Sequence, residues 1–132
     1  MAGFFSRTQI SSNSAKMIEV SYNSCGARQE CMLNEDFEKH GYCVVYDRKE
    51  RLRKVCFYVH GLRQGSYMSW HSNGMIKCIR TYEDDIPIGV EEEYNKEGRI
   101  LYHMNWDAID RKMFTGEKIT MNDFRIHVQR SS

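Results

Sequence analysis

Apolar and polar residues alternate along much of this chain, in short runs separated by polar turns. Residues 75–82 alternate with a period of two, which is typical of a β-strand. An aromatic run lies before them at 66–70, and Asn73-Gly74 lies between the two runs. Asn-Gly in this position predicts a β-hairpin with a type I′ turn. The same order recurs at 90–106 and more weakly at 41–58, so the sequence predicts an antiparallel meander of β-hairpins.

The stretch 41–106 repeats itself with a period of 24 residues, and such self-similarity is typical of repeat proteins. A single hairpin cannot bury its aromatic side chains, so we expect the units to stack. The recurring positions are Gly41, Gly65 and Gly89; Tyr46, Trp70 and Tyr94; Leu52, Ile76 and Ile100; Tyr58, Tyr82 and Trp106; and the turn glycines Gly74 and Gly98.

Every second residue of 52–58, 76–82 and 100–106 should share one face of the sheet. This face is apolar or aromatic apart from Lys54 and Arg80. We therefore expect a buried ladder of Tyr and Trp, in which cross-strand pairs contribute about 0.2–1 kcal/mol each. A stacking platform for single-stranded nucleic acid would need Lys and Arg interleaved on that face. Basic residues cluster instead near the first turn, so we predict core packing and no nucleic-acid partner.

The spacing of Gly65, Tyr67, Trp70 and Gly74, with a weaker copy at Gly89, Tyr94 and Gly98, resembles MORN repeats. The variant subtype, with its Tyr/Trp-x-x-Asn-Gly turn, is the most similar, and the resemblance covers about half of the chain. MORN proteins act in protein–protein assembly, and some associate with membrane lipids. The variant subtype also occurs as the antitoxin-type component of bacterial toxin–antitoxin pairs, and MORN-like proteins are multiplied in some large DNA viruses.

The resemblance implies a non-catalytic protein-interaction or scaffold module, for example a component of a large assembly such as a large DNA virus particle. One alternative is an antitoxin-type protein that binds and neutralises a toxin. Another is a lipid- or membrane-associated adaptor, although a net charge of only +1 argues weakly against it. We expect a protein partner or self-association, no cofactor and no enzymatic activity.

The length of 132 residues indicates one domain. We expect a flexible arm at 1–16 and a single repeat domain at 17–132, with a strand at 17–22 and a connecting loop at 34–41. Residues 107–132 should cap the stack, with a short helix that Asp107 caps and strands at 117–121 and 124–129.

The chain shows neither a signal peptide nor an apolar run of membrane-spanning length. Together with an odd number of cysteines, five, this favours a reduced intracellular (cytoplasmic) location or a place within a virus particle.

Candidate metal ligands are few and lack a zinc-site spacing. Cys25 with Cys31, or His40 with Cys43 and His60, could converge in space, but nothing in their spacing requires it. Free cysteines usually behave as small apolar residues, and we expect this of Cys43, Cys56 and Cys78. Cysteine–histidine pairs can be written, but no nucleophile elbow marks one of them.

The charged residues are distributed unevenly along the predicted stack. Because complementary charges set register and orientation, we expect head-to-tail packing or an oppositely charged partner, with ordinary charged turns as the equal alternative. The basic residues are Arg48, Lys49, Arg51, Arg53 and Lys54; the acidic residues are Glu83, Asp84, Asp85, Glu91, Glu92 and Glu93.

Overall fold

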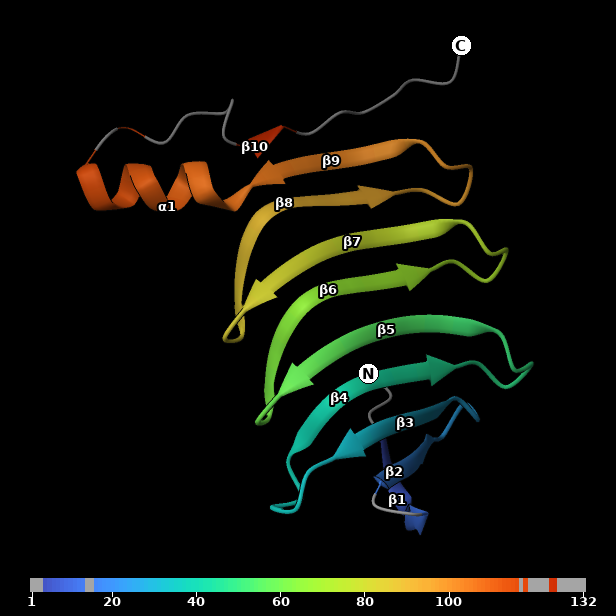
Figure 1. Ribbon diagram of the computed structural model, residues 1–132. Helices are drawn as coiled ribbons and strands as arrows, with labels where there is room; N and C mark the ends of the chain where they lie inside the picture. Colours follow the sequence, from blue (N-terminus) through green and yellow to red (C-terminus); the bar gives the residue numbers. More distant parts are fainter. Residues whose placement is uncertain (1–3, 14–15, 117, 119–123, 126–132) are drawn as a thin grey trace.

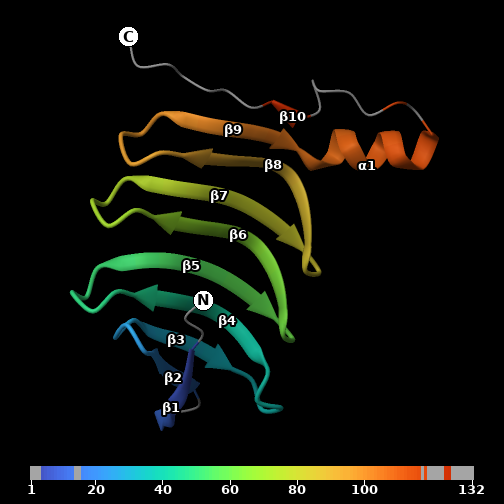
Figure 2. The ribbon, with the colours of Figure 1, turned by 180° about the vertical axis from the view of Figure 1, so that it is seen from behind.

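The computed structural model describes residues 4–13, 16–116, 118 and 124–125, and these form one sheet and one helix. Each strand pairs with the next in an antiparallel sense, in the order β1 to β10. The predicted antiparallel meander is confirmed, and Figures 1 and 2 show it as an open, arched layer. The elements are β1 (Phe4–Asn13), β2 (Lys16–Asn23), β3 (Arg28–Leu33), β4 (Lys39–Tyr46), β5 (Leu52–Val59), β6 (Leu62–Trp70), β7 (Ile76–Glu83), β8 (Ile86–Tyr94), β9 (Ile100–Asn105), α1 (Trp106–Thr115) and β10 (Phe124–Arg125).

Five hairpin turns share one backbone geometry, at 23–27, 34–38, 47–51, 71–75 and 95–99. In each turn the first amide donates to the fifth carbonyl, and the fourth amide donates to the first carbonyl. The fourth residue always has a positive φ, whether it is a glycine or, as in the turns of 34–38 and 47–51, Phe37 or Glu50. The turn is thus a longer one with a single left-handed residue. The predicted type I′ turn at Asn73-Gly74 is wrong, because only Gly74 of this pair has a positive φ. Residues 34–38 also form a hairpin turn rather than the predicted loop.

The first side chain explains why these short sequences turn. In four of the five turns it is Asn or Asp, and its Oδ1 accepts hydrogen bonds from the third and fifth amides at 2.9–3.1 Å. Such side chains replace backbone partners locally and therefore favour turns. In the remaining turn His71 takes the first position, and Asn73 Oδ1 accepts from the amide of Met75 instead.

Of these five turns, 34–38 lies at one edge of the sheet and the other four lie at the opposite edge (Figure 1). The edge of the 34–38 turn also has two-residue turns between β5 and β6 and between β7 and β8. Both central residues of each turn have positive φ, at His60-Gly61 and at Asp84-Asp85, as type I′ turns require. Each turn also bonds to the strand two places earlier in the sheet. The Gly61 amide donates to the Lys39 carbonyl at 2.8 Å, and the Asp85 amide donates to the Arg63 carbonyl at 2.9 Å. Equivalent atoms in the two contacts are 24 residues apart.

The glycine column at 41, 65 and 89 produces bends in β4, β6 and β8 (Figure 1). Their φ angles are +111°, +76° and +62°, a region that residues with a Cβ rarely adopt. Each glycine lies within a shift of register against the preceding strand, as expected for a β-bulge. At each shift two residue steps of one strand oppose four of the other, so side chains keep their alternation through the bulge.

At the amino-terminal end, residues 4–13 form β1 and pair with β2. The predicted flexible arm at 1–16 is therefore wrong for these residues. The sequence shows little alternation there, but β2 presents an unpaired edge, and backbone pairing needs no particular side chains.

At the carboxyl-terminal end, α1 follows β9 directly and contacts β8, with Ile109 buried. Its N-cap is Asn105, whose side chain accepts from the Ala108 amide, and not the predicted Asp107. The Asp107 carboxylate instead accepts from the Gly89 amide at 2.9 Å. Residues 124–125 of the predicted last strand pair with β9, and its residues 126–129 lie outside the described residues. Of the strand predicted at 117–121, only Lys118 is described, and it is not in a strand. No helix among the described residues is long and apolar enough to cross a membrane.

Candidate functional site

One face of the sheet carries every buried residue among residues 17–105, the part of the sheet whose burial is described. Cys31, Cys43 and Cys56 lie directly opposite one another on β3, β4 and β5, and the row continues through Tyr67 and Arg80. Cross-strand partners, and alternate residues along a strand, point to the same side. We call this side the tyrosine face. On β4–β7 it comprises Lys39, Gly41, Cys43, Val45, Lys54, Cys56, Tyr58, Arg63, Gly65, Tyr67, Ser69, Cys78, Arg80 and Tyr82.

Cations and tyrosine rings alternate across this face. Lys39 lies over the ring of Tyr58, Arg63 lies over Tyr82, and Lys54 and Arg80 both lie over Tyr67. The distances from Nζ or Cζ to the ring centroids are 5.1, 4.3, 5.7 and 5.3 Å respectively, within the range of attraction between a cation and an aromatic ring.

The expectation that basic residues cluster near the first turn instead of interleaving with the aromatic residues is therefore wrong for this face. Lys54 and Arg80 interrupt the apolar pattern of that face already in the sequence, so this signal was present. Lys39 and Arg63 reach it by the same alternation, along β4 and β6. They were missed because the predicted loop at 34–41 and the predicted run at 66–70 left both residues outside the predicted strands.

The tyrosine face of β4–β7 is cationic. Among the described residues, these four strands place four cations and no carboxylate on it. Two carboxylates approach from outside the four strands. Asp85, in the turn after β7, lies 2.6 Å from Arg63 Nε, and Glu91 of β8 lies 3.2 Å from Arg80 Nε. Lys39 and Lys54 form no ion pair with any described residue.

On β8 and β9 the tyrosine face continues as a network of hydrogen bonds around Glu91. The Glu91 side chain is 8% exposed, and it accepts hydrogen bonds from the hydroxyl of Tyr102 and from Trp106 Nε1 at 3.1 Å. Burial and the bond to Glu91 raise the pKa of Tyr102 well above its usual range. Burial, helped by the adjacent Cys56 thiol, likewise raises the pKa of Tyr58 to about 12. Both hydroxyls are therefore neutral donors near pH 7.

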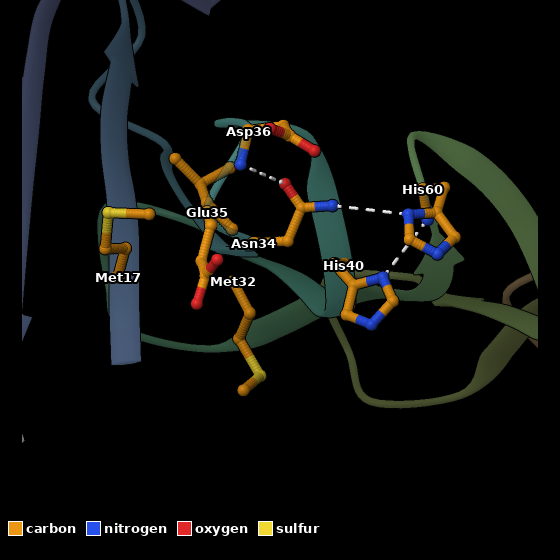
Figure 3. Close-up of a pocket in the computed structure, with 8 residues that line it drawn as sticks. Met17, Met32, Asn34, Glu35, Asp36, His40 and His60 are labelled. Atoms are coloured by element: carbon orange, nitrogen blue, oxygen red, sulfur yellow. Dashed lines mark hydrogen bonds between the residues drawn. The ribbon is translucent and has the colours of Figure 1, made fainter. Parts of the chain in front are cut away.

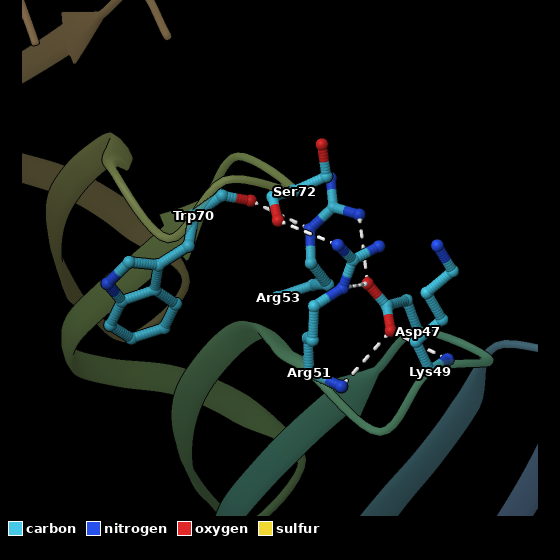
Figure 4. Close-up of polar contacts among 6 residues, drawn as sticks. All are labelled: Asp47, Lys49, Arg51, Arg53, Trp70 and Ser72. Carbon is cyan, nitrogen blue, oxygen red and sulfur yellow. Dashed lines mark hydrogen bonds and ion pairs between the residues drawn. The ribbon is translucent and has the colours of Figure 1, made fainter. Parts of the chain in front are cut away.

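Two arginines of the predicted basic cluster are bonded within the chain (Figure 4). Arg51 Nε lies 2.8 Å from Asp47 Oδ2, and Arg51 Nη1 donates to the Ser72 carbonyl at 3.0 Å. Arg53 Nε donates to the Trp70 carbonyl at 2.9 Å. These arginines thus join the β4–β5 turn to the β6–β7 turn, while the turn residues 48 and 49 remain exposed.

The predicted acidic cluster divides among three environments. Glu83 ends β7 and Asp84-Asp85 form the β7–β8 turn, at the edge of the sheet opposite the basic turn of 47–51. Glu91 is buried on the tyrosine face, and Glu93 lies on the same face. Glu92 points to the other side and accepts from the Tyr94 hydroxyl at 2.7 Å. The basic residues thus lie at β4 and β5 and the acidic residues at β7 and β8, and the two charged turns also lie at opposite edges of the sheet.

The two histidines of the metal hypothesis meet beside a hollow of about 480 Å³ (Figure 3). The rings of His40 and His60 lie 4.9 Å apart. His40 Nδ1 accepts from the His60 amide at 3.1 Å, and His60 Nδ1 lies 3.4 Å from Asn34 Nδ2. Cys43 does not join them, because it is bonded to Cys31. Within the described part of the chain, no group of three or more potential ligands is arranged to hold a metal ion.

The cysteines differ from the prediction at one pair. Cys31 and Cys43 form a disulfide between β3 and β4, so the expectation of a free Cys43 is wrong. A separation of 12 residues does not by itself predict a disulfide. The two cysteines lie opposite each other because of the register of β3 against β4. Cys56 and Cys78 are free, buried residues, as expected, and Cys25 is free and exposed. Cys31 is therefore not available to bind a metal together with Cys25, because its sulfur is bonded to Cys43.

Comparison of the chain with models of protein families, with curated proteins and with solved structures finds no match.

Proposed function

We propose that this protein is a non-catalytic protein-interaction or scaffold module built from MORN-like hairpin units. The observation that carries the proposal is the single-layered sheet. No second layer covers the side opposite the tyrosine face among the described residues, and Tyr42 and Ile86 on that side are 58% and 59% exposed. Exposed apolar side chains on a broad surface are typical of interaction sites.

The MORN-like interpretation is supported by backbone contacts that recur at the sequence period. The amide-to-carbonyl contacts of Gly61 with Lys39 and of Asp85 with Arg63 are 24 residues apart. The three column glycines have positive φ at the same spacing. Local rules that recur at a fixed interval favour stacked equivalent units.

Light scattering across protein concentration, at low and moderate salt, tests the proposal. An oligomer that grows with concentration and weakens with salt supports an assembly component. A small complex of defined stoichiometry with a co-expressed toxin would favour the antitoxin-type alternative. The proposal is contradicted if the chain stays monomeric at every concentration and co-purifies with no protein from its native source.

A further inference from the structure

We propose that the tyrosine face of β4–β7 binds an acidic, extended segment of a partner protein. This inference rests on the proposed function and specifies the chemistry of the partner. It is drawn from the charges of the face, from the way its cations are held and from its dimensions.

Charge complementarity indicates the sign of the partner. The net charge of the whole chain is only +1, yet the described residues of β4–β7 place four cations and no carboxylate on this one face. Two cations have internal partners, Asp85 and Glu91. Lys39 and Lys54 have no carboxylate among the described residues. An anionic ligand would supply what these two lysines lack, and complementary potentials orient a partner and raise its association rate.

The tyrosine rings restrict the positions of the four cationic side chains. Each of the four lies over a ring at 4.3–5.7 Å from its centroid. A long side chain held in this way loses less conformational freedom on binding than a free one, so less affinity is lost to ordering. The head groups stay accessible: Lys54 is exposed, and the side chains of Arg63 and Arg80 are 37% and 31% exposed.

The same contacts favour a carboxylate-bearing peptide over single-stranded nucleic acid. Nucleic-acid platforms need open ring faces on which bases stack. Here Tyr67 has cations at two positions around its ring, and Tyr82 is only 6% exposed and has Arg63 over its ring. Stacking would require displacement of these cations, whereas a carboxylate can approach their free edges.

The size of the face indicates how long the bound segment must be. Four adjacent strands span three interstrand steps of about 4.8 Å each, or roughly 14 Å. An extended chain advances about 3.3 Å per residue, so roughly four to five residues cross the face. A fluorescein-labelled hexaglutamate peptide is therefore a suitable probe.

Fluorescence anisotropy with the full chain tests the inference. Hexaglutamate should bind, a neutral Gly-Ser hexapeptide should not, and binding should weaken as salt rises from about 50 to about 500 mM. Lys39→Gln and Lys54→Gln should each weaken binding about threefold, the effect of one exposed charge pair, and the double variant about tenfold. Lys77→Gln removes the same charge from an exposed position on the other side of β7, and it should leave binding unchanged.

Three results would overturn the inference. The first is that hexaglutamate does not bind. The second is that Lys77→Gln weakens binding as much as Lys54→Gln does. The third is that labelled oligo-dT binds more tightly than hexaglutamate, with the same dependence on Lys39 and Lys54. Circular dichroism of each variant controls for folding. If the peptide fails to bind while light scattering still shows an assembly, this inference alone is wrong. If the chain neither assembles nor acquires any protein partner, the proposed function fails as well.

Discussion

Glu91→Gln should destabilise the protein more than any other charge removal on β8. The Glu91 carboxylate is nearly buried and serves three donors: Arg80 on β7, Tyr102 on β9 and the indole of Trp106 at the start of α1. Glutamine keeps the size of the side chain, but it removes the charge and replaces one acceptor oxygen by an NH₂ group. At least one buried donor then loses its partner.

The magnitude follows from the burial of each partner. Breaking a fully buried ion pair costs about 3–5 kcal/mol, but the side chain of Arg80 is 31% exposed and solvent replaces part of the lost interaction. Hydrogen bonds to charged groups contribute about 1.5–3 kcal/mol. We therefore expect the free energy of unfolding to fall by about 2 kcal/mol.

Urea unfolding followed by far-UV circular dichroism measures this change. Glu93→Gln is the matched control, because Glu93 lies on the same strand and the same face but its side chain has no hydrogen bond or ion pair with a described residue. It should change the free energy of unfolding by less than about 0.5 kcal/mol, as surface substitutions usually do. Equal effects of the two substitutions, or a change below about 0.5 kcal/mol for Glu91→Gln, would refute the reasoning.

Four further predictions concern the turns, the bends, the tyrosines and the disulfide. Gly65→Ala should cost about 1–2 kcal/mol of unfolding free energy from backbone strain alone, because φ is +76° and the added Cβ meets no atom within 4 Å; urea unfolding measures it. Asn95→Ala should cost about 1 kcal/mol through loss of two turn hydrogen bonds, whereas Asn95→Asp, which keeps the acceptor, should not. Tyr58 has a raised pKa of about 12 in the folded protein, so the stability it contributes should be complete below about pH 10 and be lost as pH rises through about 12; ultraviolet titration of Tyr58→Phe should show one tyrosine fewer ionising near pH 12. Reduction of Cys31–Cys43 should lower the free energy of unfolding by about 2–3 kcal/mol, as expected for a short closed loop, and an unchanged urea midpoint in reductant would contradict it.

Local features of the fold could be predicted from the sequence because their causes are local. The alternation at 75–82 and the polar residues at 71–74 belong to one hairpin, and its strands lie where the pattern indicates. The column of Gly41, Gly65 and Gly89 marks positions with positive φ, a property of the residue itself. The connectivity follows as well, since consecutive antiparallel strands joined by short turns pair with each other.

Contacts between distant residues were decided only by the tertiary structure. The disulfide of Cys31 with Cys43 depends on the register of β3 against β4, and the strand at 4–13 depends on the open edge of β2. Lys39 and Arg63 lie on the tyrosine face because β4 and β6 continue past the bulges at Gly41 and Gly65. Sequence patterns report which side a residue takes relative to its neighbours along one strand. Register, bulges and sheet edges set which residues of different strands meet, and these depend on pairing energies summed over the whole sheet.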